Sequence, residues 1–172
     1  MESMGEQVCP VCNTKNLTLT QAEDEIPFFG KIFIFGMSCS SCGFRKSDVE
    51  AAEMKEPAKY ELEVSSDEDM NIRIIRSSEG KIKIPYVIDI DPGESAEGFV
   101  TNVEGLIDKV RGIVQHLLDS DDDEENKDKA RKILKKLMRA KFGQEKIKII
   151  IEDPTGNSAI ISDKAVKTKL KG

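Results

Sequence analysis

The 172-residue sequence predicts a mainly β protein that also contains α-helix, an α+β fold built from two domains. Two Cys-x-x-Cys pairs within residues 1–52 indicate a small cysteine-rich module. From Lys59 onward, several segments alternate apolar and polar side chains, which is typical of half-buried strands. Between about residues 101 and 143, apolar side chains recur at helical spacing, which indicates two helices inserted among the strands.

The four cysteines have the spacing of a metal site. Cys9-Pro10-Val11-Cys12 and Cys39-Ser40-Ser41-Cys42 are separated by 26 residues. Each pair turns tightly, so together they bring four sulfur atoms around one ion in the tetrahedral arrangement that Zn²⁺ prefers. Four thiolates leave no open position for a substrate, so the sequence predicts one structural zinc ion held by Cys9, Cys12, Cys39 and Cys42.

Other interpretations of the cysteines are possible. They could form two disulfides or a redox Cys-x-x-Cys with two bystanders, but a redox pair normally opens a helix in a βαβ unit, and neither pair has that context. Four thiolates also bind iron. The 26-residue spacing exceeds the roughly 15–20 residues common in zinc ribbons, and a long hairpin between the pairs would accommodate it.

Composition narrows the class of partner. The net charge is -6 and the pI is about 5.0. Residues 1–52 carry four Lys or Arg and seven Asp or Glu, whereas nucleic-acid binders usually present a basic surface. The acidic start has no apolar segment of a signal peptide, and no apolar run approaches the roughly 20 residues of a membrane span. We therefore expect a cytoplasmic protein that binds protein rather than nucleic acid or membrane.

The segment between the cysteine pairs holds four of the chain's seven Phe residues. Residues 26–37 are rich in β-branched and aromatic side chains, so they predict a strand. A zinc ribbon has almost no core, so some of these Phe side chains should pack on the metal site or the next domain. Alternatively Phe28 and Phe29, just after Pro27, form an exposed apolar contact for a partner.

The second domain, residues 53–172, reads as strands interrupted by a helical hairpin. Pro85 divides residues 81–90 and favours an edge strand or a bend. Thr101 and Glu104 have the spacing of a capping box at the start of the first helix. The turn-rich segment Asp153–Ser158 lies between two apolar runs and predicts a C-terminal hairpin. The basic tail from Lys164 is expected to be frayed or loosely docked.

Residues for catalysis are not evident in this sequence. The acidic run around Asp119–Asp123 begins like a calcium loop, but its sixth and twelfth positions are Glu124 and Ala130 rather than Gly and Glu. The one histidine, His116, lies in a helix without a partner cysteine, and we expect it on the helix surface. We therefore predict no catalytic residue and no enzyme activity.

Three segments together resemble the ZPR-type zinc-finger family. The first combines both cysteine pairs with Ile26-Pro27-Phe28-Phe29. The second is Thr101-Asn102-Val103-Glu104-Gly105-Leu106-Ile107, which is similar to the family's T-T-V-E-G-L-L. The third, Asp153–Ser158, is similar to its D-P-x-G-N-S turn. They occur in the family's order within roughly residues 7–162.

The resemblance implies a fold. It implies a zinc ribbon, residues 1–52, and then a domain of double-stranded β-helix type with an inserted helical hairpin at about 101–143. Eukaryotic members carry two such modules in tandem, whereas this chain has one copy and is similar to the archaeal form. Asn102 replaces the family's second Thr, and Tyr86 stands where Glu is usual.

The resemblance also implies a function. Eukaryotic members bind translation elongation factor 1-alpha and assist its folding, so a chaperone or adaptor for that client is the leading expectation. The alternatives are a nucleic-acid-associated zinc ribbon of the transcription or translation machinery, and an enzyme in the β domain, which the single histidine disfavours. The Thr101–Ile107 and Asp153–Ser158 segments could equally serve only to shape the fold. The expected partner contacts are Ile26, Pro27, Phe28, Phe29, Glu104, Asp153 and Asn157.

Overall fold

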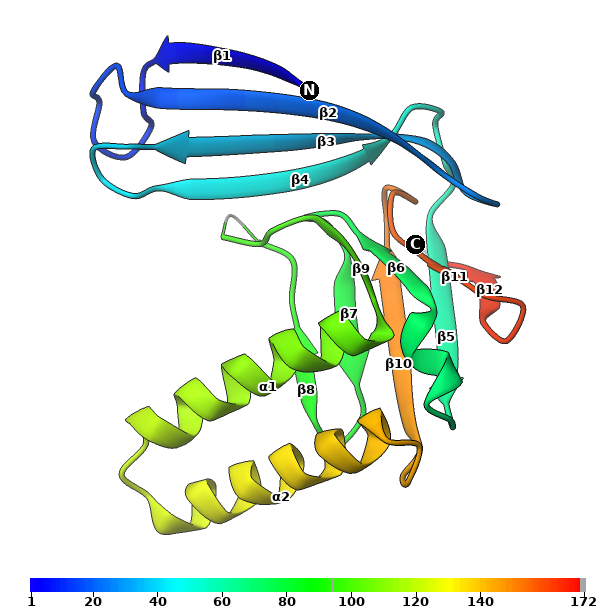
Figure 1. Ribbon diagram of the computed structural model, residues 1–172. Coiled ribbons are helices and arrows are strands. Elements are labelled where there is room, and N and C mark those ends of the chain that lie inside the picture. The colour runs from blue at the N-terminus through cyan, green and yellow to red at the C-terminus, as the bar shows by residue number, and fades with distance from the viewer. Residues whose placement is uncertain (94, 171–172) are drawn as a thin grey trace.

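An N-terminal ribbon and a larger β domain make up the protein (Figure 1). The computed structural model describes residues 1–93 and 95–170. The ribbon is one antiparallel sheet in the order β1-β2-β3-β4. Its strands are β1 (Glu2–Gln7), β2 (Leu17–Ile26), β3 (Gly30–Cys39) and β4 (Arg45–Ala51). The sequence did not predict β1, because its side chains are almost all exposed and do not alternate in polarity.

A long hairpin of β2 and β3 joins the two cysteine pairs. Its register runs from Leu17 opposite Cys39 to Ile26 opposite Gly30. The hairpin therefore accommodates the 26-residue spacing. The prediction of a single strand over residues 26–37 was wrong at its start, because the chain turns at Pro27 and Phe28, which has a φ of 66°.

The second part is a double-stranded β-helix, or jelly roll, as the resemblance implied. Its two sheets have the strand orders β12-β5-β10-β7-β8 and β11-β6-β9. The strands are β5 (Ala58–Val64), β6 (Arg73–Arg76), β7 (Lys81–Ile84), β8 (Ile88–Ile90), β9 (Phe99–Asn102), β10 (Ile147–Asp153), β11 (Ala159–Ile161) and β12 (Val166–Lys169). A short 3-10 helix, η1 (Glu68–Asn71), precedes β6.

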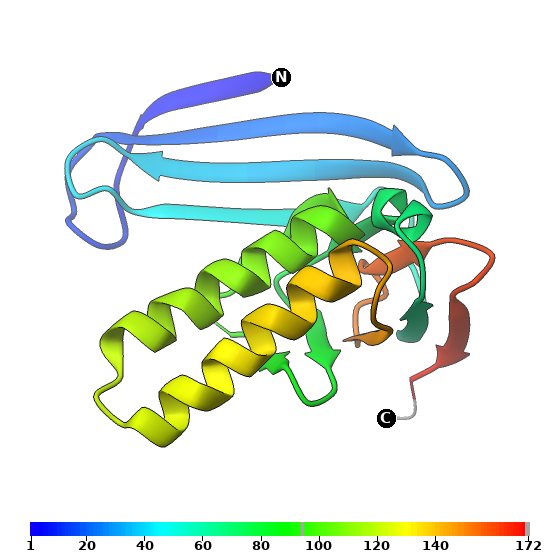
Figure 2. The same ribbon diagram turned by 60° about the horizontal axis from the view of Figure 1, so that its bottom comes forward.

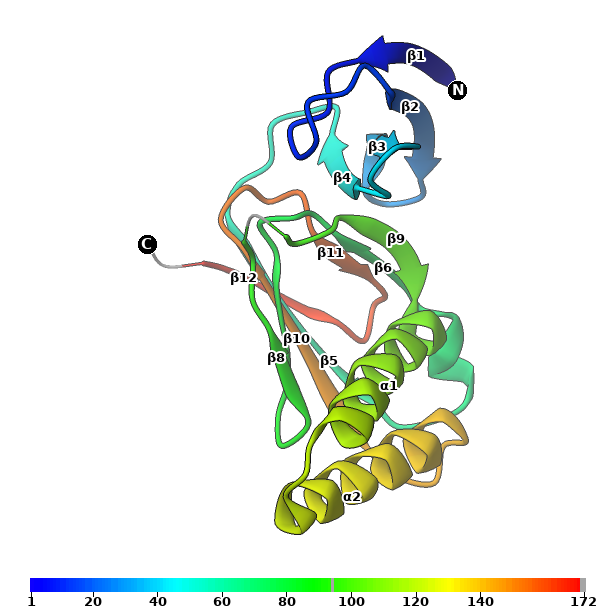
Figure 3. The same ribbon diagram turned by 90° about the vertical axis from the view of Figure 1, so that its left-hand side faces the viewer.

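The predicted helical hairpin is formed by α1 (Val103–Ser120) and α2 (Glu124–Lys141). Figures 1 and 3 show it at the end of the jelly roll opposite the ribbon. The capping box predicted for Thr101 and Glu104 was wrong by one residue. Asn102 caps α1 by accepting a hydrogen bond from the Gly105 N–H at 2.8 Å, while Thr101 still pairs with Ile74 in the sheet.

The core of the jelly roll lies between the five-stranded sheet and α1. Leu62, Ile82 and Ile149 come from three neighbouring strands and are fully buried against Leu106 and Val110. The core is therefore aliphatic, as a chain without Trp requires. Neither helix within the described residues combines the length and the apolar character needed to cross a membrane.

The predicted C-terminal hairpin is absent from the described part of the chain. Strand β10 pairs with β5 and β7 in the larger sheet, whereas β11 pairs with β6 in the smaller one. The turn at residues 154–158 therefore moves the chain from one sheet to the other. Turn residues between two apolar runs identify a reversal, but they do not say which strand the second run will join.

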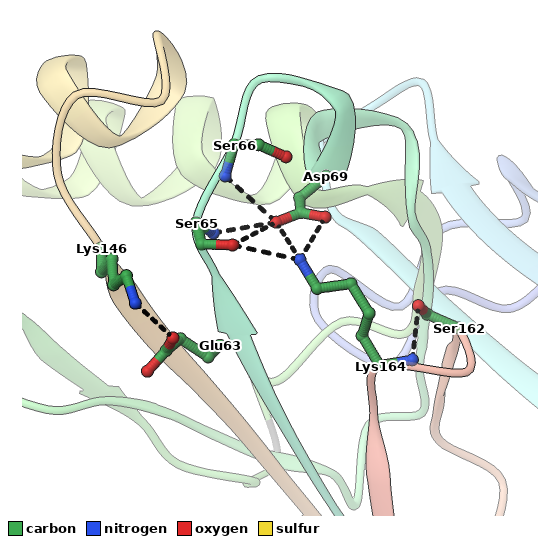
Figure 4. A network of polar contacts seen from close by, with 7 residues as sticks. All are labelled: Glu63, Ser65, Ser66, Asp69, Lys146, Ser162 and Lys164. Carbon is green, nitrogen blue, oxygen red and sulfur yellow. Dashed lines mark hydrogen bonds and ion pairs between the residues drawn. The ribbon is translucent and has the colours of Figure 1, made fainter.

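The basic tail was expected to be frayed or loosely docked, and it is docked, as an ordered edge strand; residues 171–172 lie outside the described range. Strand β12 pairs with β5 at the sheet edge. Lys164 fixes its start through Asp69, with Nζ–Oδ distances of 2.7 and 2.6 Å (Figure 4). The Asp69 carboxylate also accepts hydrogen bonds from the N–H groups of Ser65 and Ser66. Burial alone would raise the pKa of Asp69, but these donors outweigh it and lower the pKa.

Replacing Lys164 by Ala is expected to loosen the C-terminal strand. Asp69 is almost fully buried, and it would keep its backbone donors but lose its cation. Because Lys164 is about half exposed, we expect a loss of only about 1 kcal/mol in unfolding free energy. Amide exchange in β12 should speed up more than elsewhere. Lys169→Ala, which removes an exposed pair with Glu56, is the matched control and should change neither measurement.

The ribbon is docked firmly on the jelly roll, across which its long strands run (Figure 2). Ser47 and Gly98 exchange two hydrogen bonds of 2.8 Å, one of them through the Ser47 hydroxyl. Asp48 accepts hydrogen bonds from the N–H and the hydroxyl group of Ser78. One apolar cluster spans both parts and contains Ile26, Phe29, Ile32, Val49, Ile75 and Ala159. These contacts fix the orientation of the ribbon.

Candidate metal centre and partner-binding residues

Both cysteine pairs lie in turns with the same backbone pattern. The carbonyl of Cys9 accepts a hydrogen bond from the N–H of Asn13, and the carbonyl of Cys39 accepts one from the N–H of Gly43. Asn13 and Gly43 have φ values of 57° and 75°. Glycine and asparagine adopt this left-handed conformation most readily. Gly43 directly follows the second cysteine pair, where this conformation is often required, whereas Asn13 gives no such clear signal.

The turns bring the four sulfur atoms together. All four Sγ atoms lie within 4.8 Å of one another. Cys9–Cys42 and Cys12–Cys39 are both 3.7 Å apart. Four sulfurs placed tetrahedrally at about 2.3 Å from one zinc ion would be about 3.8 Å apart, so the arrangement fits that ion.

Hydrogen bonds prepare these sulfurs to bind a cation. The backbone N–H of Cys42 is the main reason why the pKa of Cys39 is lowered to about 6. The Thr14 hydroxyl is the largest cause of the lowered pKa of Cys12. For Cys42, the Phe44 N–H lowers the pKa, but desolvation and the three neighbouring sulfurs outweigh it and raise the pKa to about 12. Four adjacent thiolates therefore require the compensating charge that a divalent ion supplies.

The centre is closed and structural. Cys9 and Cys39 are buried with Leu17 in a small cluster, and only Cys42 is exposed. All four ligand positions of the zinc ion would be filled by sulfur, which leaves none for a substrate. The chain thus carries one four-cysteine zinc site, as its sequence predicted.

The four expected partner contacts of the ribbon lie at the tip of the β2–β3 hairpin, where two of them are buried and two are exposed. Ile26 and Phe29 are buried in the cluster that joins the two domains, so they are not surface contacts. Pro27 and Phe28 are exposed, and Phe28 is as exposed as in an extended peptide. The Phe29 N–H donates to the Ile26 carbonyl at 3.0 Å. Proline followed by a positive φ has the pattern of a type II turn, in which Phe28 takes the position usually held by Gly.

Asp153, a further expected contact, is also buried and has a structural role. Its carboxylate accepts hydrogen bonds from the hydroxyls of Ser77, Ser158 and Thr155 at 2.6, 2.5 and 2.6 Å. The Thr155 N–H donates to it as well, at 2.7 Å. Burial alone would raise the pKa of Asp153, but these donors lower it. The carboxylate therefore holds the turn after β10 to the strand end at Ser77.

The rest of this turn contacts the ribbon. The Asn157 side-chain oxygen accepts a hydrogen bond from the Ala51 N–H at 3.1 Å. Gly156 has a φ of 73°, and a Cβ atom there would lie 2.4 Å from the Glu56 carbonyl oxygen. The turn thus requires Gly at this position. This turn connects the two domains. Asn157 was expected to contact a partner, but its side-chain oxygen binds the ribbon of the same chain.

Glu104, the remaining expected contact, lies on the first turn of α1. It is exposed and forms an ion pair of 2.9 Å with Lys141 of α2. Lys141 also pairs with Asp108 at 3.1 Å. These contacts link the two helices. A role of Glu104 in partner binding stays a prediction.

Sequence reasoning missed Arg76. This residue ends β6 and is buried, with only 4% of its surface exposed. Its nitrogens donate to the carbonyls of Gly80, Glu97 and Asp91. Burial is the main reason why its pKa is lowered. One signal was available, because Arg76 directly follows Ile74 and Ile75. An arginine at such a position is ordinarily exposed, so its burial was not predicted.

The two parts of the chain match two families of domains. Residues 2–57 match the ZPR1 zinc-finger domain, and residues 68–171 match the ZPR1 jelly-roll domain. A ZPR1-like protein of Methanocaldococcus jannaschii is 41% identical over 165 residues, which cover 95% of this chain and 83% of that protein. A ZPR1-like protein of Pyrococcus horikoshii is 36% identical, with 94% and 75% covered.

Eukaryotic relatives are longer. The chain is 30% identical to the human zinc finger protein ZPR1, of which it covers 34%. It is 29% identical to the protein of Schizosaccharomyces pombe named zinc finger chaperone zpr1, again covering 34% of it. Because both domains match and an archaeal relative is similar over most of its length, this chain belongs to the ZPR1 zinc-finger family, in the single-module form of its archaeal relatives.

Proposed function

We propose that this chain is a zinc-dependent chaperone or adaptor whose client is translation elongation factor 1-alpha. The name of the fission-yeast relative, a zinc finger chaperone, supports client binding rather than catalysis. The elongation factor is the client that the family resemblance implies. We also propose that the chain acts in the cytoplasm, because a reducing compartment keeps four cysteines available as metal ligands instead of disulfides.

The observation that carries this proposal is the conformation of Phe28. Its ring is fully exposed at the hairpin tip, and its φ of 66° is costly for a bulky side chain. Backbone strain of this kind costs on the order of 1–3 kcal/mol and is concentrated at functional sites. A hollow of about 380 Å³ lies beside the ring and is lined in part by Phe29, Tyr60 and Ile160. An aromatic anchor next to a hollow that is lined partly by apolar side chains suits a protein partner.

Phe28→Gly tests the proposal without harming the fold. Glycine is the preferred residue at this turn position, so the variant should be at least as stable as the wild type. If Phe28 contacts the client, binding of purified elongation factor 1-alpha should weaken at least about tenfold. Isothermal titration calorimetry and a pull-down from a native extract measure this. A Cys39→Ser, Cys42→Ser variant should lose the client as well, because it loses zinc.

The chain contains a matched control in the turn between β7 and β8. Residues Ile84–Val87 form the same kind of turn, with Pro85 followed by an exposed Tyr86 at a φ of 62°. Tyr86→Gly therefore makes the same change of backbone and aromatic surface elsewhere. Because both turns share the strained backbone, the hollow beside Phe28 is what assigns the client contact to the hairpin tip, and Tyr86→Gly should keep the client. Equal binding by wild type and Phe28→Gly would contradict a contact at this tip. Recovery of RNA without the elongation factor, weakening steeply with salt, would support the nucleic-acid alternative.

A further inference from the structure

A large apolar groove is lined by α1 and by the segment that leads from β8 to β9, and none of the four cysteines lines it. Figure 1 shows these two elements on the jelly roll. Its volume is about 880 Å³, within the range of sites that bind small ligands or peptide segments. The apolar part of its lining consists mainly of Ile90, Pro92, Phe99, Leu106, Ile113 and Leu117. Neither the zinc site nor the hairpin tip uses this surface.

Arg76 gives the groove a fixed positive charge. Its Nε, Nη1 and Nη2 atoms donate to the carbonyls of Gly80, Glu97 and Asp91 at 2.9, 3.0 and 3.3 Å. The side chain is buried and cannot reorient without losing these bonds. A guanidinium carries five N–H donors, so two are left for another acceptor. An oxygen anion is the acceptor that this planar group binds best.

Lys109 places a second cation in the same groove. Its Nζ lies 4.8 Å from the centre of the Phe99 ring, and the Arg76 guanidinium carbon lies 5.8 Å from the same centre. Among residues 1–93 and 95–170, no carboxylate lies within 4.0 Å of a nitrogen of Arg76 or Lys109. Asp91 and Glu97 also line the groove. Asp91 is paired with Lys81 at 2.9 Å, so among the described lining residues Glu97 is the one carboxylate without an ion pair.

The wall formed by α1 is open at its middle. A Cβ atom added to Gly112 would meet no other atom within 4 Å. On either side of it, Lys109, Ile113 and Leu117 face the groove. The stretch from Leu106 to Leu117 is about 16 Å long at 1.5 Å per residue. An extended peptide of about five residues has that length.

We propose that this groove binds a short segment of a protein client in which apolar side chains stand beside a carboxylate. The apolar walls would take the side chains, and Arg76 and Lys109 would take the carboxylate. This inference rests on the client-binding function proposed above and adds a second, separate contact to it. Arg76 and Lys109 outnumber Glu97, the one described carboxylate of the lining that has no ion pair, so charge complementarity selects an acidic segment rather than a basic one.

Two labelled peptides test the inference by fluorescence anisotropy. One carries three Leu or Phe residues and ends in Glu with a free carboxyl group; the other has the same apolar residues and ends in amidated Lys. The acidic peptide should bind at least about tenfold more tightly. Gly112→Leu should abolish its binding by filling the groove, and Lys109→Glu should weaken it at least about tenfold.

These variants separate loss of binding from loss of fold. Leucine replaces glycine at an open position of a helix, so Gly112→Leu should melt at or above the temperature of the wild type. Lys132→Glu reverses an exposed charge on α2 and should leave binding unchanged. Equal binding of the two peptides, or unchanged binding by Gly112→Leu, would refute the inference. The inference would also be refuted if oleate bound, neither peptide bound, and Gly112→Leu abolished the binding of oleate.

The two proposals can fail separately. If the elongation factor binds in a Phe28-dependent manner but neither peptide binds, only the inference about the groove is wrong. If the acidic peptide binds and Gly112→Leu blocks it, while no elongation factor is recovered, the groove stands and the proposed client is wrong.

Discussion

Removal of zinc by a strong chelator is expected to unfold the cysteine-bearing end of the ribbon while the jelly roll stays folded. The cluster around the metal contains only three buried residues, Cys9, Leu17 and Cys39. So small an apolar core cannot offset the conformational entropy of the two turns. Structural zinc sites of this kind contribute about 10–16 kcal/mol at neutral pH. We expect one zinc ion per chain by elemental analysis.

Hydrogen exchange should show where this effect ends. The opposite end of the ribbon is held to the jelly roll by the cluster that includes Ile32, Val49 and Ile75. Chelation should therefore remove protection in β1 and around both cysteine pairs, and much less at residues 30–34. Cys42→Ser should reproduce the pattern, whereas Ser41→Ala, which loses only a bond to the Asn16 side chain, should not. Unchanged protection at the cysteine turns after chelation would show that zinc is not structural.

Features that depend on residues close together in the sequence could be predicted from it. The zinc ligands follow from cysteine spacing, because each pair forms a local turn. The helices follow from apolar periodicity, and the end of α2 follows from Gly143, which has a φ of 68°. The core strands follow from alternation, as in β5, where Leu62 and Val64 are buried and Glu63 is exposed.

Most of the failures concern contacts between distant segments, whereas the turn at Phe28 is a local one. Ile26-Pro27-Phe28-Phe29 is apolar enough for a strand, and nothing local reveals a positive φ at a phenylalanine. The tail became a strand because Lys164 finds a buried aspartate 95 residues away. Arg76 is buried because carbonyls of a later loop surround it. Such pairings depend on the topology, which one sequence does not specify.

Asp153→Ala should be the most destabilising single change outside the zinc centre. It leaves the buried hydroxyls of Ser77 and Ser158 without their acceptor, and it also removes the acceptor of the hydroxyl and N–H of Thr155, which is exposed and can bond to water instead. Each unmet buried donor costs about 1–3 kcal/mol, and partial relaxation should leave a loss of about 3–4 kcal/mol. Urea unfolding followed by circular dichroism at 222 nm measures it. Asp163→Ala, at an exposed position ten residues away, should have no measurable effect.

The same carboxylate should make stability depend on pH. The folded protein lowers the pKa of Asp153 below the ordinary value of 3.8, so the unfolded chain takes up a proton more readily. The contribution to stability is therefore complete above about pH 5 and is lost as the pH falls through the folded pKa. Asp69, whose pKa is also lowered, adds to the same trend.

Asp153→Asn isolates this effect, because the amide keeps the shape of the side chain but cannot titrate. The free energy of unfolding of the wild type should fall more steeply between pH 5 and pH 2 than that of the variant. The signal at 222 nm comes mainly from α1 and α2 in the jelly roll, so release of zinc from the ribbon in acid contributes little to it. Equal slopes in the two proteins would mean that Asp153 has the same pKa in the folded and unfolded chains, and that its hydroxyl donors do not stabilise the charged form.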